Sequence, residues 1–164
     1  MIYWRMQLHP DDSNLSVKHT TESVSAGFIG LGFGNADPGD LKKVKPTDPS
    51  LNLDKNEDRY WQFADDMQKG DIVAIFCHNQ PFALTKVTGD YNFIKSTVGE
   101  IGVWFNHFRS IDKDYTKYFL DLNATTRNKL EELIKSLPTP MTIQKHSDNT
   151  VNVYQFIDKW ANLP

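Results

Sequence analysis

The sequence predicts an α+β domain in which a small curved mixed sheet, or a barrel, is flanked by helices. Segments typical of strands and of helices are mixed along the chain, without the regular strand-helix alternation of a parallel α/β fold. No segment is repeated. The length of 164 residues is enough for one hydrophobic core. We therefore expect one domain over residues 1–164, standing alone or as the N-terminal part of a longer protein.

The first part of the chain predicts two strands around a short helix. Residues 2–8 (IYWRMQL) are rich in strand formers. Residues 16–25 fit a short helix, and the apolar run GFIGLGF over 27–33 fits a buried strand. Residues 35–56 contain three prolines and show no period. They predict a long loop, and loops of that length are often functional.

A helix followed by a hairpin is the most clearly marked part of the chain. Asn56 is a suitable N-cap, and apolar residues at helical spacing predict a helix over 58–68. Residues 71–78 and 82–88 are predicted strands, joined across Asn79, Gln80 and Pro81. Because this connection is too short for a parallel crossover, we expect the two strands to pair antiparallel.

The remaining elements complete the mixed pattern. Strands are expected over 103–111 and 115–122. Thr125 or Thr126 is the expected cap of an amphipathic helix that ends at Leu137. The segment 138–145 (PTPMTIQK) is a predicted last strand, and 153–163 (VYQFIDKWANL) a predicted closing helix.

Composition excludes several classes of protein. The net charge of -3 argues against nucleic-acid binding by bulk charge, although a local basic face remains compatible with it. One basic cluster consists of Lys42, Lys43 and Lys45. The single Cys77, inside an apolar strand, predicts a buried thiol and excludes a disulfide framework. No apolar run approaches the length of a membrane span, so we expect a cytoplasmic protein.

Motifs of catalysis and cofactor binding are missing from the sequence. The histidines have no spacing typical of a zinc site: His9, His19, His78, His107 and His146. Gly30, Gly32 and Gly34 resemble a nucleotide loop, but Asn35 breaks the G-x-G-x-x-G pattern. Tight backbone packing explains these glycines more simply. We therefore expect no catalytic residue, no cofactor and no metal.

Aromatic rings are the candidates for ligand binding. Four of them are expected at strand ends or near a helix start: Phe33, Trp61, Tyr91 and Trp104. Rings that converge from separate elements can sandwich a flat ligand, and stacking on one base is worth about 1–3 kcal/mol. Packing in the core is the alternative for each ring.

Four motifs carry a resemblance to a known family. The segments YWRM, GFIGLGFG with a downstream GDL, FADDMQKGDIVAIF, and ALTKVTGDYNF follow one another in this order. The chain thereby resembles, over about residues 1–120, the EVE and YTH-like branch of the PUA-like superfamily. It is most similar to the N-terminal domain of McrB-type modification-dependent restriction proteins. Two features depart from that family: Phe33 stands where the family often has Trp, and the 35–56 loop is long.

The resemblance implies a PUA-like fold, a curved barrel-like sheet with helices around it. It implies a non-catalytic domain that flips a modified base into an aromatic cage without a cofactor, as the specificity domain of a restriction system. The partner would be duplex DNA, with a nuclease or GTPase of the same system and no membrane. The cage would consist of the four rings, and the polar readers would be Asp40, Asn79 and Asp90. The phosphate-binding residues would be Lys86, Lys95, Arg109 and Lys113.

Three other functions stay open from the sequence. The chain could read a modification in RNA. It could be a small enzyme that acts on a nucleotide, with Asp65, Asp90 or His107 as the general base. It could also be a protein interaction domain whose 35–56 loop carries the contact.

Overall fold

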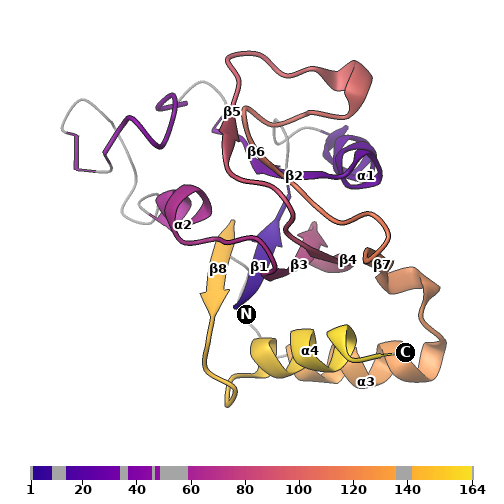
Figure 1. Cartoon of the computed structure of the whole chain (residues 1–164). Coiled ribbons are helices and arrows are strands. Elements are labelled where there is room, and N and C mark those ends of the chain that lie inside the picture. The colour runs from indigo at the N-terminus through magenta and orange to yellow at the C-terminus, as the bar shows by residue number, and fades with distance from the viewer. Residues whose placement is uncertain are drawn as a thin grey trace.

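The computed structural model describes residues 2–8, 14–33, 37–45, 47–48, 59–135 and 142–163, and Figure 1 shows how their helices and strands are arranged. These residues form four helices, a five-stranded mixed sheet and a three-stranded antiparallel sheet. The predicted α+β class is confirmed. The described strands form two separate sheets and no closed barrel.

The five-stranded sheet has the order β7-β4-β3-β1-β8. Its central pair is parallel, whereas β8 joins β1 and β7 joins β4 antiparallel. The parallel pair is possible because a helix, a strand of the other sheet and a second helix lie between β1 and β3 in the chain. The strands are β1 (Tyr3–Gln7), β3 (Ile72–Cys77), β4 (Gln80–Lys86), β7 (Lys117–Tyr118) and β8 (Ile143–His146).

The predicted antiparallel hairpin is confirmed by β3 and β4. Its turn is tighter than expected, because His78 and Asn79 alone connect the strands, with φ of 47° and 65°. Positive φ at both central residues is the geometry of a two-residue turn whose twist matches that of the flanking strands. Pro81 is therefore the second residue of β4 rather than part of the loop.

The three-stranded sheet has the order β2-β6-β5 and is formed by β2 (Phe28–Leu31), β5 (Asn92–Phe93) and β6 (His107–Ser110). The predicted glycine packing is confirmed at Gly30. A Cβ at Gly30 would lie 2.3 Å from the carbonyl oxygen of His107 and 2.4 Å from the Cβ of Phe105. Gly32 has open space around it, and Gly34 lies outside the described residues.

The helices are α1 (Ser16–Ala26), α2 (Tyr60–Asp65), α3 (Ala124–Ile134) and α4 (Asn152–Ala161). The helix α2 is shorter than predicted, and its expected cap Asn56 lies outside the described residues. The predicted threonine cap of α3 is wrong, because Asn123 is the N-cap. Asn123 has the extended backbone of a cap, and its side chain accepts a hydrogen bond from the backbone N–H of Thr126.

Two predicted strands are mostly irregular in the structure. Only His107–Ser110 of the 103–111 segment is a strand, while Val103 makes a single bridge to Val98. The 115–122 segment forms the two-residue β7 followed by the 3₁₀ helix η5 (Phe119–Asp121). Both segments are rich in strand formers. In the 103–111 segment, the contacts of Trp104 with α1, described below, hold the first half outside the sheet.

The five-stranded sheet separates two hydrophobic cores. Along β1, Trp4 and Met6 face one core, whereas Tyr3 faces the other. The helices α3 and α4 cover the second core and lie side by side in Figure 1, with α1, α2 and the smaller sheet on the opposite side. Cys77 is buried as predicted, and burial raises the pKa of its thiol. Within the described ranges, no helix has the length and apolar character that would be needed to span a bilayer.

Candidate nucleobase-binding site

Four aromatic rings gather with His107 at the end of the smaller sheet. Its ring centroid lies 4.9 Å from that of Phe33, 5.1 Å from Phe93 and 6.0 Å from Tyr91. Tyr60, on α2, packs edge-on against Phe33 at 4.8 Å. His107 is fully buried, while the other four residues are partly exposed. We call Phe33, Tyr60, Tyr91, Phe93 and His107 the aromatic cluster.

A chain of hydrogen bonds fixes the orientation of His107. The backbone N–H of Leu41 donates to the Tyr91 hydroxyl at 2.9 Å, and that hydroxyl lies 2.8 Å from Nδ1 of His107. Nε2 of His107 lies 3.2 Å from both carboxylate oxygens of Asp37. A neutral imidazole satisfies every group if Tyr91 donates to Nδ1 and Nε2–H donates to Asp37. These hydrogen bonds also connect the 37–41 segment to the aromatic cluster.

Burial lowers the pKa of His107, and it outweighs the nearby Asp37 carboxylate, which raises that pKa. The pKa of His146, on β8, is lowered to about 4 by burial and by the guanidinium of Arg5. Both imidazoles are therefore neutral at pH 7, and both resist protonation in the folded state.

We expect the free energy of unfolding to decrease as the pH falls from 7 to 5. Unfolded histidine binds a proton near pH 6.5, whereas folded His107 and His146 bind one only at lower pH, so acid favours the unfolded state. Urea unfolding at several pH values measures the slope. His107→Gln and His146→Gln should each flatten it, and an unchanged slope in both variants would contradict the assignment.

Trp61 lies behind the aromatic cluster and supports it from the core. Its side chain is 5% exposed, and its indole N–H donates to the carbonyl oxygen of Val44 at 2.8 Å. It packs with Leu41 and Ala64 in a small core cluster that Phe33 and Tyr91 also contact. Trp61 therefore fixes the 41–44 segment and does not present a face to a ligand.

Trp104 lies away from the other predicted cage rings. Its ring stacks on His19 of α1, with centroids 3.7 Å apart and planes 9° apart. Its indole N–H donates to a carboxylate oxygen of Glu22 at 2.8 Å. Both contacts attach the chain before β6 to α1. The structure thus brings Phe33 and Tyr91 together, with Trp61 beneath them and Trp104 apart.

Asp40 is the predicted polar reader that lies nearest to the cluster. Burial raises the pKa of its carboxyl, but hydrogen bonds from the Lys42 backbone and the Lys43 side chain lower that pKa by more. Its side chain is 20% exposed, and that of Asp37 is 23% exposed. The site therefore offers carboxylate oxygens, which accept hydrogen bonds from amino groups. Asp90, the residue before Tyr91, is exposed and pairs with Lys69 at 2.8 Å.

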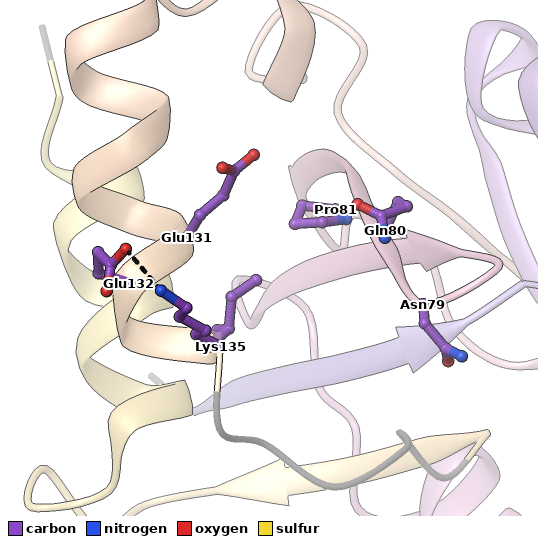
Figure 2. A pocket seen from close by; sticks show the side chains of 7 residues that line it. Asn79, Gln80, Pro81, Glu131, Glu132 and Lys135 are labelled. Atoms are coloured by element: carbon purple, nitrogen blue, oxygen red, sulfur yellow. Dashed lines mark hydrogen bonds and ion pairs between the residues drawn. The ribbon is translucent and has the colours of Figure 1, made fainter.

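Asn79 lies at a different place, at the tip of the β3–β4 hairpin. It accepts a hydrogen bond from the side-chain amide of Gln7 at 3.0 Å. It lines an open cavity of about 430 Å³ between the hairpin and α3, together with Gln80, Pro81, Glu131, Glu132, Ile134 and Lys135. Figure 2 shows Glu131 extending from α3 toward the hairpin, while the Asn79 side chain points away from α3. Rings of the aromatic cluster do not line this cavity.

The predicted phosphate-binding residues are spread over the molecule. Lys95 is exposed in the connection that follows β5, two residues after Phe93 of the aromatic cluster. Lys113 is exposed beyond the opposite end of β6, and the ammonium of Lys86 lies 4.2 Å from the ring centroid of Tyr115. Arg109 is 3% exposed, and its guanidinium donates to the carbonyl oxygens of Phe63, Ala64 and Gly89. In this position Arg109 holds the fold and presents no donor at the surface.

Sequence reasoning missed Asp37, Tyr60 and Phe93 as members of this site. Asp37 belongs to a loop without a period, and its partner His107 is far away in the sequence, so no local pattern connects them. Phe93 was within reach, because it ends the quoted ALTKVTGDYNF segment. Among the described residues, no three histidine, cysteine, aspartate or glutamate side chains gather as ligands of a metal ion.

A family model matches most of the chain. The family model of a domain of unknown function, DUF8426, matches residues 4–131. The matched region runs from β1 into α3 and contains the whole aromatic cluster. The search of curated proteins found no match to the chain.

Proposed function

We propose that this chain, which belongs to the DUF8426 family of domains of unknown function, is a non-catalytic reader of a modified nucleobase in DNA. The base is extruded from the duplex and stacks against the partly exposed rings of Phe33 and Tyr91. The domain has a PUA-like architecture and acts as the specificity domain of a modification-dependent restriction system. A nuclease or GTPase of the same system supplies the catalytic activity.

The observation that carries this proposal is the aromatic cluster itself. Rings from β5, β6, α2 and the segment after β2 meet at one end of the smaller sheet. The sequence predicts two of these rings, Phe33 and Tyr91, at a nucleobase site. A flat apolar ligand with a polar edge suits partly exposed rings that have carboxylates beside them.

The carboxylates of Asp37 and Asp40 favour a base that carries an exocyclic amino group. Carboxylate oxygens accept hydrogen bonds from N4 of cytosine, and N6 of adenine offers the same kind of donor. Thymine and uracil have a carbonyl oxygen at the corresponding position, which a carboxylate repels. The proposed ligand is therefore a modified cytosine or adenine.

The charged residues near the site support a modest contribution of phosphate contacts to the binding affinity. Lys95 lies on the β5–β6 connection, and Lys42 and Lys43 follow Asp40 on the segment that Tyr91 anchors. Lys42 and Lys43 already pair with Asp65 and Asp40, at 3.1 and 3.3 Å. With a net charge of -3, the domain can neutralise few phosphates, so its affinity should decrease only moderately with salt.

The nucleotide-acting enzyme is the rival function, and the surroundings of its candidate bases disfavour it. Both ring nitrogens of His107 are engaged, Nδ1 with Tyr91 and Nε2 with Asp37, and the side chain is fully buried. A general base must reach the proton that it removes. Asp65 and Asp90 are exposed and pair with lysines.

We expect Phe33→Ala to abolish most of the preference for the modified base, with a loss of about 1–3 kcal/mol in binding that base. Binding of unmodified duplex should change little, because phosphate contacts position a duplex without reading it. The measurement is a titration of modified and unmodified duplexes by fluorescence anisotropy, with thermal unfolding of the same variants.

Phe82→Ala is the matched control for this experiment. Phe82 is also half-buried and packs against the same core as Phe33, but it lies on β4 next to Tyr118, away from the cluster. Both variants should lose stability to a similar extent, and only Phe33→Ala should lose discrimination. Discrimination that survives in folded Phe33→Ala would remove Phe33 from the site.

A further inference from the structure

The connection between β5 and β6 carries two exposed aliphatic side chains at its tip. The tip, residues 98–102, contains the 3₁₀ helix η4 (Gly99–Ile101), and Val98 and Ile101 are 40% and 61% exposed. The connection begins after Phe93 and ends at His107, which are cross-strand partners in the aromatic cluster. In Figure 1 it extends from the ends of these strands past α1.

The tip is held in one conformation by contacts on both sides. Val98 and Val103 exchange backbone hydrogen bonds of 2.8 and 3.1 Å. The hydroxyl of Ser23, on α1, donates to the carbonyl oxygen of Gly102 at 2.8 Å. A Cβ at Gly99 would lie 2.5 Å from the Trp104 ring, which is itself stacked on α1. Trp104, expected in the cage, is thus a support for the tip.

We infer that Ile101 and Val98 form an apolar wedge that enters the base stack of the duplex from which the modified base is extruded. This inference rests on the proposed function. Proteins that distort a duplex often insert aliphatic side chains between base steps, which compensates for the lost stacking. Extrusion of a base leaves such a gap and costs a few kcal/mol. A preformed apolar tip fills the gap without an ordering cost of its own.

The position of the tip and the nearby Lys95 fit this role. Val98 is five residues after Phe93. A fully extended chain of that length spans about 17 Å, so Val98 lies no farther than that from Phe93. Lys95, on the same connection, is exposed and can contact a phosphate beside the gap. Glu100 is also exposed at the tip. Its charge should weaken binding of every nucleic acid alike, and Glu100→Gln should strengthen all binding to the same extent.

The test compares duplex and single-stranded DNA that carry the same modified base. The probes are oligonucleotides with N6-methyladenine, 5-methylcytosine, 5-hydroxymethylcytosine or its glucosylated form at one position. Ile101→Ser should bind the preferred duplex about tenfold more weakly than the unsubstituted chain, with unchanged affinity for the single strand. A mismatch opposite the modified base lowers the cost of extrusion and should reduce this deficit. Ile101→Leu should retain duplex binding.

Leu120→Ser is the matched control, since Leu120 is 77% exposed on the 3₁₀ helix η5, in another part of the chain. It should leave both affinities unchanged. If Ile101→Ser behaves like Leu120→Ser, or weakens single strands as much as duplexes, the wedge is refuted while the proposed function stands. If the unsubstituted chain prefers no modified base in either form, the proposed function itself fails.

Discussion

Asp71→Ala is expected to lower the free energy of unfolding by roughly 3 to 5 kcal/mol. The Asp71 side chain is 4% exposed, and its carboxylate accepts three hydrogen bonds: from the backbone N–H groups of Ile2 and Gln68 and from the indole N–H of Trp4. Alanine would leave all three donors without this acceptor. Because Asp71 joins the start of β1 to the turn before β3, its loss weakens the central strand pair.

These three hydrogen bonds explain the Gly70-Asp71 sequence at the start of the hairpin. Gly70 adopts a φ of 93°, which favours glycine, and the turn then presents the Asp71 carboxylate to the neighbouring strand. The motif is a structural clamp between segments that are distant in the sequence. It contributes no group to the candidate site.

Urea unfolding with a constant m-value measures the loss. Asp71→Asn keeps one carbonyl oxygen and should lose about half as much stability as Asp71→Ala. Asp66→Ala is the matched surface control, because Asp66 is exposed and pairs with Lys145 at 3.0 Å. Asp66→Ala should lower the free energy of unfolding by less than about 1 kcal/mol. Equal losses in Asp66→Ala and Asp71→Ala would contradict the clamp.

Arg109→Ala should destabilise the protein by a similar amount, roughly 3 to 5 kcal/mol. The guanidinium donates to the carbonyl oxygens of Phe63 and Ala64, which belong to α2, and to that of Gly89, at 2.8 to 3.1 Å. These carbonyls near the end of a short helix lack intrahelical partners. The guanidinium also packs over the Phe63 ring at 5.5 Å. Thermal and urea unfolding measure the loss.

The same variant decides between the two roles of Arg109. Arg109→Lys keeps the charge, but its single ammonium nitrogen cannot replace three guanidinium nitrogens that point to separate carbonyls, so it should also be strongly destabilised. Lys113→Ala, at an exposed position beyond the same strand, should unfold like the unsubstituted chain. If Arg109→Ala unfolds normally and loses affinity for every duplex, Arg109 is a phosphate ligand after all.

Local sequence patterns predicted the elements whose conformation depends on residues that are close in the sequence. The hairpin of β3 and β4 and the helix α1 both follow from short-range signals. The 103–111 segment has the composition of a strand throughout, but the stacking of Trp104 on His19 fixes its first half outside the sheet. That contact joins residues far apart in the chain, and no local pattern encodes it.

The sequence predicted those residues of the candidate site that belong to recognisable motifs, and it missed the others. Phe33 and Tyr91 lie at the ends of recognisable segments, and both belong to the aromatic cluster. Whether an aromatic residue is a ligand or a core residue depends on exposure, and exposure is set by the tertiary fold. Trp61 is buried for that reason. Asp37 becomes part of the site only through its contact with His107.

The most direct test of the proposed function is the affinity of the unsubstituted chain for matched duplexes. One duplex is unmodified, and the others carry N6-methyladenine, 5-methylcytosine, 5-hydroxymethylcytosine or glucosylated 5-hydroxymethylcytosine at a single position. The proposal predicts a preference for one modified duplex by about tenfold or more, since stacking on the cluster is worth about 1–3 kcal/mol. It also predicts that Phe33→Ala removes this preference. Equal affinity for all five duplexes would contradict the proposed function.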